Sequence, residues 1–223
     1  MSPTAQTKTR ESRGMRDEIF TALKTGILTG TLPPGRQLRL RDIAKEHGAS
    51  MMPVREAIVA LEAVGLVTQI PYRGAFVAGL SVDALQDFYS TRLVIEPGAV
   101  EISTPKLTSA HFESLEALLN EIDVKSSKDN WPLVISLDEQ FLMTIYREAG
   151  STSLVEMIQR LWNRVTPYKH HLITAEPAAA YGIVRYNREL LAALEARDGA
   201  LAKQIMNDSL LGAMHKLSEA LSS

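Results

Sequence analysis

The sequence contains no cysteine, and this absence excludes several kinds of site at once. A chain without thiols forms no disulfide bond, no thiolate zinc site and no cysteine nucleophile. The sequence also lacks any apolar run close to the roughly 20 residues that a transmembrane helix needs. Its polar beginning, MSPTAQTKTRESRG, has no apolar segment of the kind found in secretory signals. We therefore expect a cytoplasmic protein without a membrane partner.

Sequence motifs of several enzyme classes are absent as well. There is no G-x-x-x-x-G-K loop for binding phosphate and no H-E-x-x-H pair of zinc ligands. An enzyme built on this chain would need one of these features, or a recognisable pair of nucleophile and base. We therefore do not expect an enzyme, and an enzyme on a helical scaffold is the weakest alternative.

Charge is divided unevenly along the 223 residues, although the net charge is only −2. Residues 1–79 carry 11 Lys and Arg against 7 Asp and Glu, whereas residues 80–223 carry 13 against 19. A basic N-terminal part suits a polyanion such as DNA, and an acidic remainder points to another task. Chance clustering of charges is the other explanation, because single-sign patches are common.

Residues 13–79 show the pattern of a winged helix-turn-helix, and the polar residues 1–12 are predicted to form a flexible arm. Apolar spacing and turn residues predict three helices and two strands, at residues 13–30, 38–47, 50–64, 66–70 and 75–77. A Gly-containing turn at 48–50 joins the second helix to the third. Two helices around a tight turn, followed by a hairpin, form a winged helix-turn-helix.

The stretch SMMPVREAIVALEAVGLV predicts the third helix in detail. Ser50 suits the N-cap because its hydroxyl can accept a free backbone N–H. Pro53 falls in the first turn, where a missing N–H costs little. Gly65 suits a left-handed C-terminal cap. One face of the helix is apolar, and Arg55 projects from the other side.

The remainder, residues 80–223, is predicted to be a second domain that is entirely helical. Helix caps and apolar stripes predict six helices, at residues 81–102, 108–124, 130–148, 151–171, 178–197 and 198–221. Six helices of this length with short connections form an antiparallel bundle. The predicted fold is therefore mainly α, with a winged helix-turn-helix followed by an antiparallel all-helical bundle.

These segments resemble a known family. GTLPPGRQLRLRDIA, GASMMPVREAIVALEAVGLV and PYRGAFV resemble the winged helix-turn-helix of the GntR family of bacterial transcription regulators. RLVIEPGAVEIS and LDEQFLMTIYREAG resemble the FCD-type effector domain of its FadR branch. The resemblance implies a ligand-responsive regulator, a repressor by family default, that binds an inverted-repeat operator as a homodimer. A metal-responsive regulator on the same scaffold is the alternative.

The resemblance also implies a set of DNA-binding residues. Arg55 lies on the recognition helix, where a guanidinium can bind guanine O6 and N7, and Arg41 matches a second DNA-contacting arginine. Ser50 can present its hydroxyl and a helix N-terminus to a phosphate. Arg73 and Gly74 match the wing tip, where an arginine can enter the minor groove. The other interpretation is that these arginines are only solvated surface residues.

Met51 and Met52 depart from the family pattern, which most often has Arg-Thr after the capping serine. A methionine cannot hydrogen-bond a base, although it can pack on a thymine methyl group. Both residues stay in the predicted DNA surface, but the family's usual operator preference does not transfer to this chain.

The resemblance further implies a divalent metal in the helical domain, held by one Asp and three His. Asp138 matches the Asp, but the three histidine positions are occupied by Leu142, Asn187 and Ser209. A zinc-like site needs about four N, S or O ligands. We therefore expect no metal and no other cofactor.

Two interpretations of these four positions remain open. In the first, they line a metal-free pocket for a small metabolite, such as an organic acid or a sugar acid, and Arg92 and Arg164 neutralise its carboxylate. In the second, the polar side chains hydrogen-bond one another and water, or Asp138 pairs with an arginine for structural reasons. The sequence identifies neither the effector nor the operator nor the regulated genes.

Overall fold

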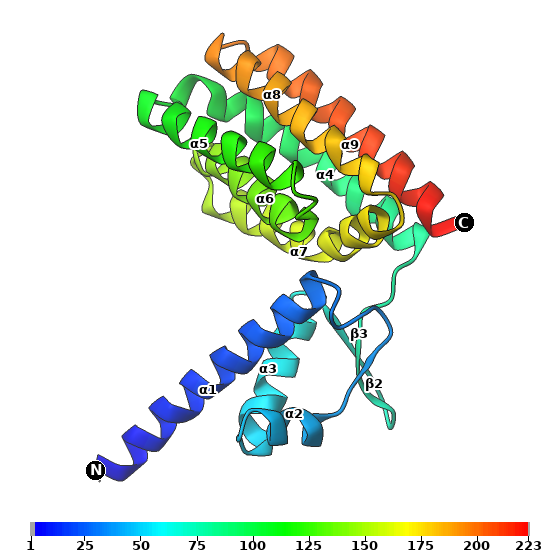
Figure 1. Ribbon diagram of the computed structural model, residues 1–223. Helices are drawn as coiled ribbons and strands as arrows, with labels where there is room; N and C mark the ends of the chain where they lie inside the picture. The colour runs from blue at the N-terminus through cyan, green and yellow to red at the C-terminus, as the bar shows by residue number, and fades with distance from the viewer. Residues whose placement is uncertain (1–2, 223) are drawn as a thin grey trace. The chain divides into compact units, whose positions relative to one another are not determined.

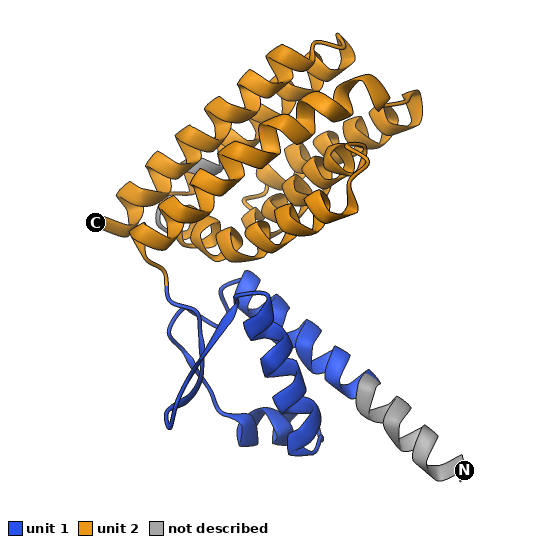
Figure 2. Ribbon diagram, turned by 180° about the vertical axis from the view of Figure 1, so that it is seen from behind, with its two compact units in different colours: residues 1–79 blue, residues 80–223 orange. Residues whose placement is uncertain are grey.

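The computed structural model describes residues 3–222, and for residues 3–13, 175, 179 and 180 it describes the backbone alone (Figure 1). The chain divides into two compact units, residues 1–79 and residues 80–223 (Figure 2). The predicted arm at residues 1–12 falls on residues that lie outside the described side chains, and residues 1–2 lie outside the described chain altogether.

As far as the structure describes it, unit 1 contains three helices and a small sheet. The helices are α1 (Pro3–Leu28), α2 (Leu40–Glu46) and α3 (Met51–Ala63), and the strands are β1 (Gln37–Leu38), β2 (Val67–Ile70) and β3 (Gly74–Val77). The antiparallel order is β1-β3-β2, with Leu38 opposite Ala75 and Thr68 opposite Phe76. A helix-turn-helix with a two-stranded wing was expected and is present, and β1 adds a third strand.

Three details of unit 1 differ from the sequence prediction. Helix α1 begins at Pro3 instead of residue 13, because Gln, Lys, Arg and Glu favour helices even without an apolar stripe. Helix α2 begins at Leu40, after β1. Ser50 occupies the N-cap of α3 with an extended backbone, but its side chain accepts no capping hydrogen bond. One reason is that Pro53, the third residue of the helix, has no N–H to donate.

The predicted stop at Gly65 is confirmed. Gly65 has a φ of 75°, and its N–H donates to the Glu62 carbonyl at 2.9 Å, while the Leu66 N–H donates to the Leu61 carbonyl at 3.0 Å. These two bonds form a Schellman motif, which satisfies carbonyls at the helix end. The chain then enters β2 directly, so Gly65 sets the position of the wing relative to α3.

In the described part of unit 2, six long helices form a bundle. They are α4 (Val82–Ser103), α5 (Ser109–Ser126), α6 (Trp131–Arg147), α7 (Thr152–Ala175), α8 (Tyr181–Glu195) and α9 (Gly199–Ser222), with short 3-10 helices η1 (Thr104–Lys106) and η2 (Pro177–Ala180). Helix α4 packs against α6, α7 and α9, and α5 packs against α6 and α8. The Ser81 hydroxyl accepts the Ala84 N–H at 3.2 Å, which confirms the predicted cap of α4.

Each unit has its own hydrophobic core. In unit 1, α1 contributes Ile19, Leu23 and Ile27, and α3 contributes Ile58 and Leu61. The core of unit 2 draws on all six of its long helices, with Trp162 and Phe141 fully buried. The predicted fold class, a winged helix-turn-helix followed by an all-helical domain, is confirmed. Within the described chain, none of the helices has the length and hydropathy needed to cross a membrane.

Candidate functional site

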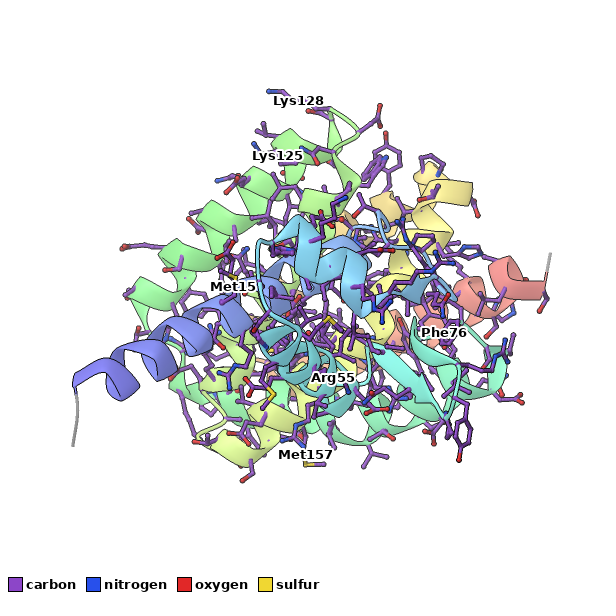
Figure 3. The ribbon with its side chains drawn as sticks, turned by 90° about the horizontal axis from the view of Figure 1, so that it is seen from below. Met15, Arg55, Phe76, Lys125, Lys128 and Met157 are labelled. Atoms are coloured by element: carbon purple, nitrogen blue, oxygen red, sulfur yellow. The ribbon has the colours of Figure 1, made fainter. Side chains whose placement is uncertain are left out.

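The outer face of α3 carries a stripe of exposed side chains. Met52, Arg55 and Val59 follow one another at helical spacing, and all three are exposed. The opposite face, which includes Val54 and Ile58, is buried in the core of unit 1. Figure 3 shows Arg55 on α3. This burial pattern leaves the Arg55 guanidinium available to a partner in solution.

The other residues expected at the DNA differ in exposure. Arg41 on α2 and Ser50 before α3 are both exposed. Met51 is half-buried and packs against the core of unit 1, whereas 64% of Met52 is exposed. The two methionines therefore have different surroundings, and only Met52 faces solvent on the outer stripe.

The wing tip is held in a defined conformation. Gly74 has a φ of 98°, which favours glycine. The Arg73 carbonyl accepts a hydrogen bond from the Gln37 side chain at 2.9 Å, and the Arg73 guanidinium lies 5.8 Å from the centre of the Phe76 ring. Tyr72, which sequence analysis did not single out, is fully exposed at this tip with a φ of 62°. The tip therefore presents an aromatic ring beside an arginine.

Unit 2 contains a cavity of about 160 Å³. It is bounded by residues of α4, α6, α7, α8 and α9. Five of the six residues that the sequence predicts at the effector line it, namely Arg92, Asp138, Leu142, Asn187 and Ser209. The tertiary structure thus brings together positions from four helices that are far apart in the sequence.

Asp138 is the centre of the polar wall of this cavity, and it is buried. Its Oδ2 atom accepts a hydrogen bond from Lys169 Nζ at 2.9 Å, and its Oδ1 atom accepts one from Asn187 Nδ2 at 3.0 Å. The two interpretations of these positions therefore do not exclude each other. Asp138 and Asn187 bond each other and also line a cavity, and the cation beside Asp138 is a lysine.

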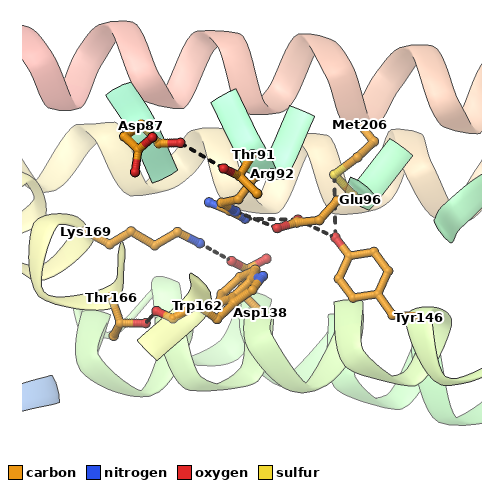
Figure 4. A network of polar contacts seen from close by, with 10 residues as sticks. All are labelled: Asp87, Thr91, Arg92, Glu96, Asp138, Tyr146, Trp162, Thr166, Lys169 and Met206. Carbon is orange, nitrogen blue, oxygen red and sulfur yellow. Dashed lines mark hydrogen bonds and ion pairs between the residues drawn. The ribbon is translucent and has the colours of Figure 1, made fainter. Parts of the chain in front are cut away.

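A second buried network lies next to the first (Figure 4). Arg92 Nε donates to Glu96 Oε1 at 2.5 Å, and Arg92 Nη2 donates to Glu96 Oε2 at 3.1 Å. The Tyr146 hydroxyl donates to Glu96 Oε2 at 2.7 Å. Burial raises the pKa of Tyr146 well above its usual value, so this hydroxyl stays protonated. Glu96 therefore neutralises Arg92 within the protein.

Arg164 is not among the residues that line the cavity, and its role at the effector stays a prediction. It is exposed on α7, and its guanidinium lies 4.3 Å from the centre of the Phe88 ring. The face of α7 that points inward carries Trp162, Val165 and Lys169. A residue next to Val165 is turned by about 100° away from that face.

Three residues in or beside these networks were not predicted, although each carries a signal in the sequence. Lys169 continues the apolar stripe of α7, seven residues after Trp162 and three before Leu172. Glu96 follows Arg92 by four residues, the spacing of an ion pair on one helix face. Tyr89 precedes Arg92 by three residues and is fully buried.

The residues present do not fit the metal that the family resemblance implies. Leu142 offers no ligand atom, and the Asn187 amide donates to Asp138 instead of facing a cation. The Lys169 ammonium occupies the other Asp138 oxygen. Among the described residues, no group of three or more His, Asp or Glu side chains is arranged to hold a metal ion.

Comparisons with known families match both units. The model of bacterial regulatory proteins of the gntR family matches residues 15–77, and the model of the FCD domain matches residues 87–211. The second match alone covers more than half of the chain. Together they account for most of the helix-turn-helix and most of the helical unit.

Individual relatives agree with these matches. The HTH-type transcriptional regulator McbR of Escherichia coli K12 is 30% identical over 182 residues, which cover 81% of this chain and 82% of that protein. The HTH-type transcriptional repressor GlaR of Escherichia coli K12 is 27% identical over 212 residues, 89% of this chain and 94% of that protein. The solved structure of E. coli McbR/YncC superposes with a TM-score of 0.82 over 92% of this chain and 97% of that one, at 27% identity.

Proposed function

Because the chain belongs to the GntR family of bacterial regulatory proteins and carries an FCD domain, we propose that it controls transcription in response to a small metabolite. In this proposal it is a cytoplasmic homodimer that represses transcription from an inverted-repeat operator. Residues 13–79 bind DNA, and residues 80–223 bind the effector and dimerise. The repressor GlaR, a relative over most of the chain, supports the direction of regulation.

The cavity around Asp138 is the observation that supports the binding of an effector. It lies inside the FCD unit, and its lining combines aliphatic side chains with buried polar groups. Cavities that hold drug-sized ligands usually measure about 300–1,000 Å³, so a cavity of about 160 Å³ suits a small metabolite. An organic acid or a sugar acid fits the basic residues in its lining.

The outer stripe of α3 and the wing tip supply the DNA contacts of the proposal. In this proposal Arg55 binds a guanine edge in the major groove, and the exposed residues Arg41 and Ser50 contact phosphates. Arg73, with Gly74 beside it, is the candidate for the minor groove. Met52 can contact a thymine methyl group, whereas Met51 mainly positions α3 from the core side.

Effector binding is proposed to lower the affinity for DNA. A ligand shifts the equilibrium between two arrangements of the DNA-binding units only by the difference between its affinities for them. Such coupling is typically about 1–3 kcal/mol, which corresponds to an affinity change of about 5–150-fold.

A titration on the promoter region upstream of the protein's own gene tests this function. The protein should bind with an affinity that falls steeply with salt concentration, because binding to phosphates releases counterions. Addition of a panel of organic and sugar acids should weaken binding by about 5-fold or more for at least one member. Binding that is equal on unrelated DNA, or a panel without effect, would contradict the proposal.

A further inference from the structure

Among the charged residues that line the cavity, cations outnumber carboxylates. Four cations, Arg92, Lys169, Arg185 and Lys216, face one carboxylate, that of Asp138, among the described residues of the lining. Two of these cations, Arg185 and Lys216, are exposed and so remain in contact with water. A ligand that enters the buried part of the cavity therefore meets Arg92 and Lys169.

Arg92 has little capacity left for a ligand. It is only 2% exposed, and two of its three nitrogens donate to Glu96. Its guanidinium carbon also lies 4.8 Å from the centre of the Tyr89 ring and 5.0 Å from that of Trp162. Arg92 is thus committed to a buried ion pair, and a carboxylate on the ligand would have to compete with Glu96.

Lys169 is in a different position. Its Nζ atom lies 2.9 Å from Asp138 Oδ2 and 3.9 Å from the centre of the Trp162 ring, and 13% of its side chain is exposed. Figure 4 shows the side chain extended toward Asp138. An ammonium has three N–H donors, and Asp138 takes one of them. Lys169 can therefore hold Asp138 and a bound anion at the same time.

The Tyr89 hydroxyl is a second available donor. Tyr89 is fully buried and lines the cavity, and its hydroxyl makes no hydrogen bond of ordinary geometry among the described residues, although the Arg92 guanidinium lies beside it. Burial, opposed by the Arg92 charge, raises the pKa of Tyr89 to about 12, so the hydroxyl is protonated at neutral pH. A buried hydroxyl without a partner is costly, and an acceptor on a ligand would remove that cost.

The remaining lining restricts the body of the ligand. Aliphatic side chains make up much of the wall, among them Leu142, Leu172, Ile173, Leu190 and Leu210. A small volume and a wall that is mostly apolar disfavour a polyhydroxylated sugar acid. They favour a short aliphatic chain that carries one anionic group.

We propose that the effector is a compact aliphatic monocarboxylate, and that Lys169 Nζ and the Tyr89 hydroxyl bind its carboxylate. Because the chain lacks the ligands for a metal ion, Lys169 supplies the positive charge beside Asp138 instead. This inference rests on the proposed function, since it assumes that the cavity of unit 2 is the effector site.

Thermal-shift titration of the full-length protein tests the proposal. The ligands are straight-chain monocarboxylates from acetate to hexanoate and the amides of the same chain lengths. At least one carboxylate should raise the melting temperature, and the amide of equal length should not. Lys169→Met should weaken the binding of that carboxylate by about tenfold or more, the loss expected for a hydrogen bond to a charged group. Tyr89→Phe should weaken its binding severalfold. Arg160→Met, which removes an exposed cation of α7, should leave the affinity unchanged.

Lys169→Met leaves Asp138 buried without its cation and can therefore destabilise the fold. The double variant Lys169→Met/Asp138→Asn removes both charges and keeps an acceptor for Asn187. This variant should therefore stay folded, and it tests the loss of the Lys169 ammonium. Lys169→Arg should retain binding of the carboxylate in part, because it retains the charge.

Three outcomes would overturn the proposal. They are carboxylate binding that persists in the double variant, equal binding of the amides, and stabilisation of the wild type by zinc or manganese chloride alone that a chelator reverses. If a ligand stabilises the wild type and releases the promoter without depending on Lys169, this inference fails and the proposed function stands. If no acid or amide changes either melting temperature or promoter affinity, both fail.

Discussion

Arg55 lies three residues after Met52 and four before Val59 on the exposed stripe of α3. Its side chain is remote from the buried face of the same helix, so a substitution there removes no core contact. This separation makes Arg55 a clean test of base recognition, because loss of DNA binding cannot be attributed to loss of folding.

Arg55→Ala should weaken sequence-specific binding, with a loss of about 1–3 kcal/mol in discrimination between operator and unrelated DNA for each arginine contact removed. Arg55→Lys should retain part of the affinity and lose much of the discrimination, because lysine keeps the charge without the planar fork. Titration at matched salt, with the melting temperature as the control for folding, measures both effects. Arg160→Ala, in unit 2, should bind as the wild type does. Unchanged operator affinity in Arg55→Ala would remove Arg55 from the recognition surface.

His170 makes stability depend on pH. Burial, assisted by the charge of Lys169, lowers the pKa of His170 from 6.5 to about 4. Between these values the unfolded chain binds more protons than the folded chain, so stability rises with pH across this window and is lost as pH falls from about 6.5 toward 4.

The variant His170→Gln should therefore lose less stability than the wild type between pH 7 and pH 5, measured as the change in melting temperature of unit 2. The adjacent His171 is exposed, so His171→Gln is the matched control and should follow the wild type. The same dependence on pH in the wild type and His170→Gln would show that other groups cause it.

At the scale of elements, the end of α3 determines where the wing begins. Gly65 combines a φ of 75° with the two hydrogen bonds of the Schellman motif. A side chain at this φ clashes with the backbone at a cost of roughly 1–2 kcal/mol. The position therefore demands glycine for a conformational reason.

Gly65→Ala should destabilise unit 1 by about 1 kcal/mol or more, measured by denaturant unfolding. Gly14→Ala provides a control of opposite sign. Gly14 lies inside α1 and an added Cβ would meet no atom within 4 Å, so alanine should stabilise the helix by up to about 1 kcal/mol. Equal effects of the two substitutions would contradict the assignment of Gly65 as the cap.

At the scale of the whole molecule, the two hydrophobic cores belong to separate units. Leu61 is fully buried in the first and Leu115 in the second. A domain with its own core can unfold on its own, and the chain should therefore show two calorimetric transitions.

Leu61→Ala should lower the temperature of one transition and Leu115→Ala that of the other. Each substitution should reduce the free energy of unfolding of its unit by about 2–5 kcal/mol. A stabilising carboxylate should raise only the transition temperature that Leu115→Ala lowers. A single transition that both substitutions shift equally would show instead that the units unfold together.

Much of the fold could be predicted from the sequence because the signals are local. Caps such as Ser81 and Gly65 and the apolar stripes of six long helices depend on residues a few positions apart. The strand β1 was missed because two residues are too short for a pattern, and pairing with β3 across the chain defines it. The long start of α1 was missed because a polar stretch was equated with a flexible one.

The candidate site was predictable in part, for the same reason. Asp138 and Leu142 share one face of α6, so their convergence follows from a spacing of four residues. On α7 the sequence prediction named Arg164, whereas Lys169 lies on the helix face that lines the cavity. Glu96 lies four residues after Arg92, so the same spacing also predicts their ion pair, although the pair was not among the predictions.

The sequence by itself determined the types of the elements, the helix-turn-helix and the resemblance to its family, since these depend on short-range pattern. The tertiary structure alone decided which charges meet in the cavity. Lys169 and Asn187 reach Asp138 across 31 and 49 residues of chain, and a helix rotation of one residue would send either side chain elsewhere. Buried charges must be paired where they lie, so the packing of α6, α7 and α8 placed a lysine beside Asp138.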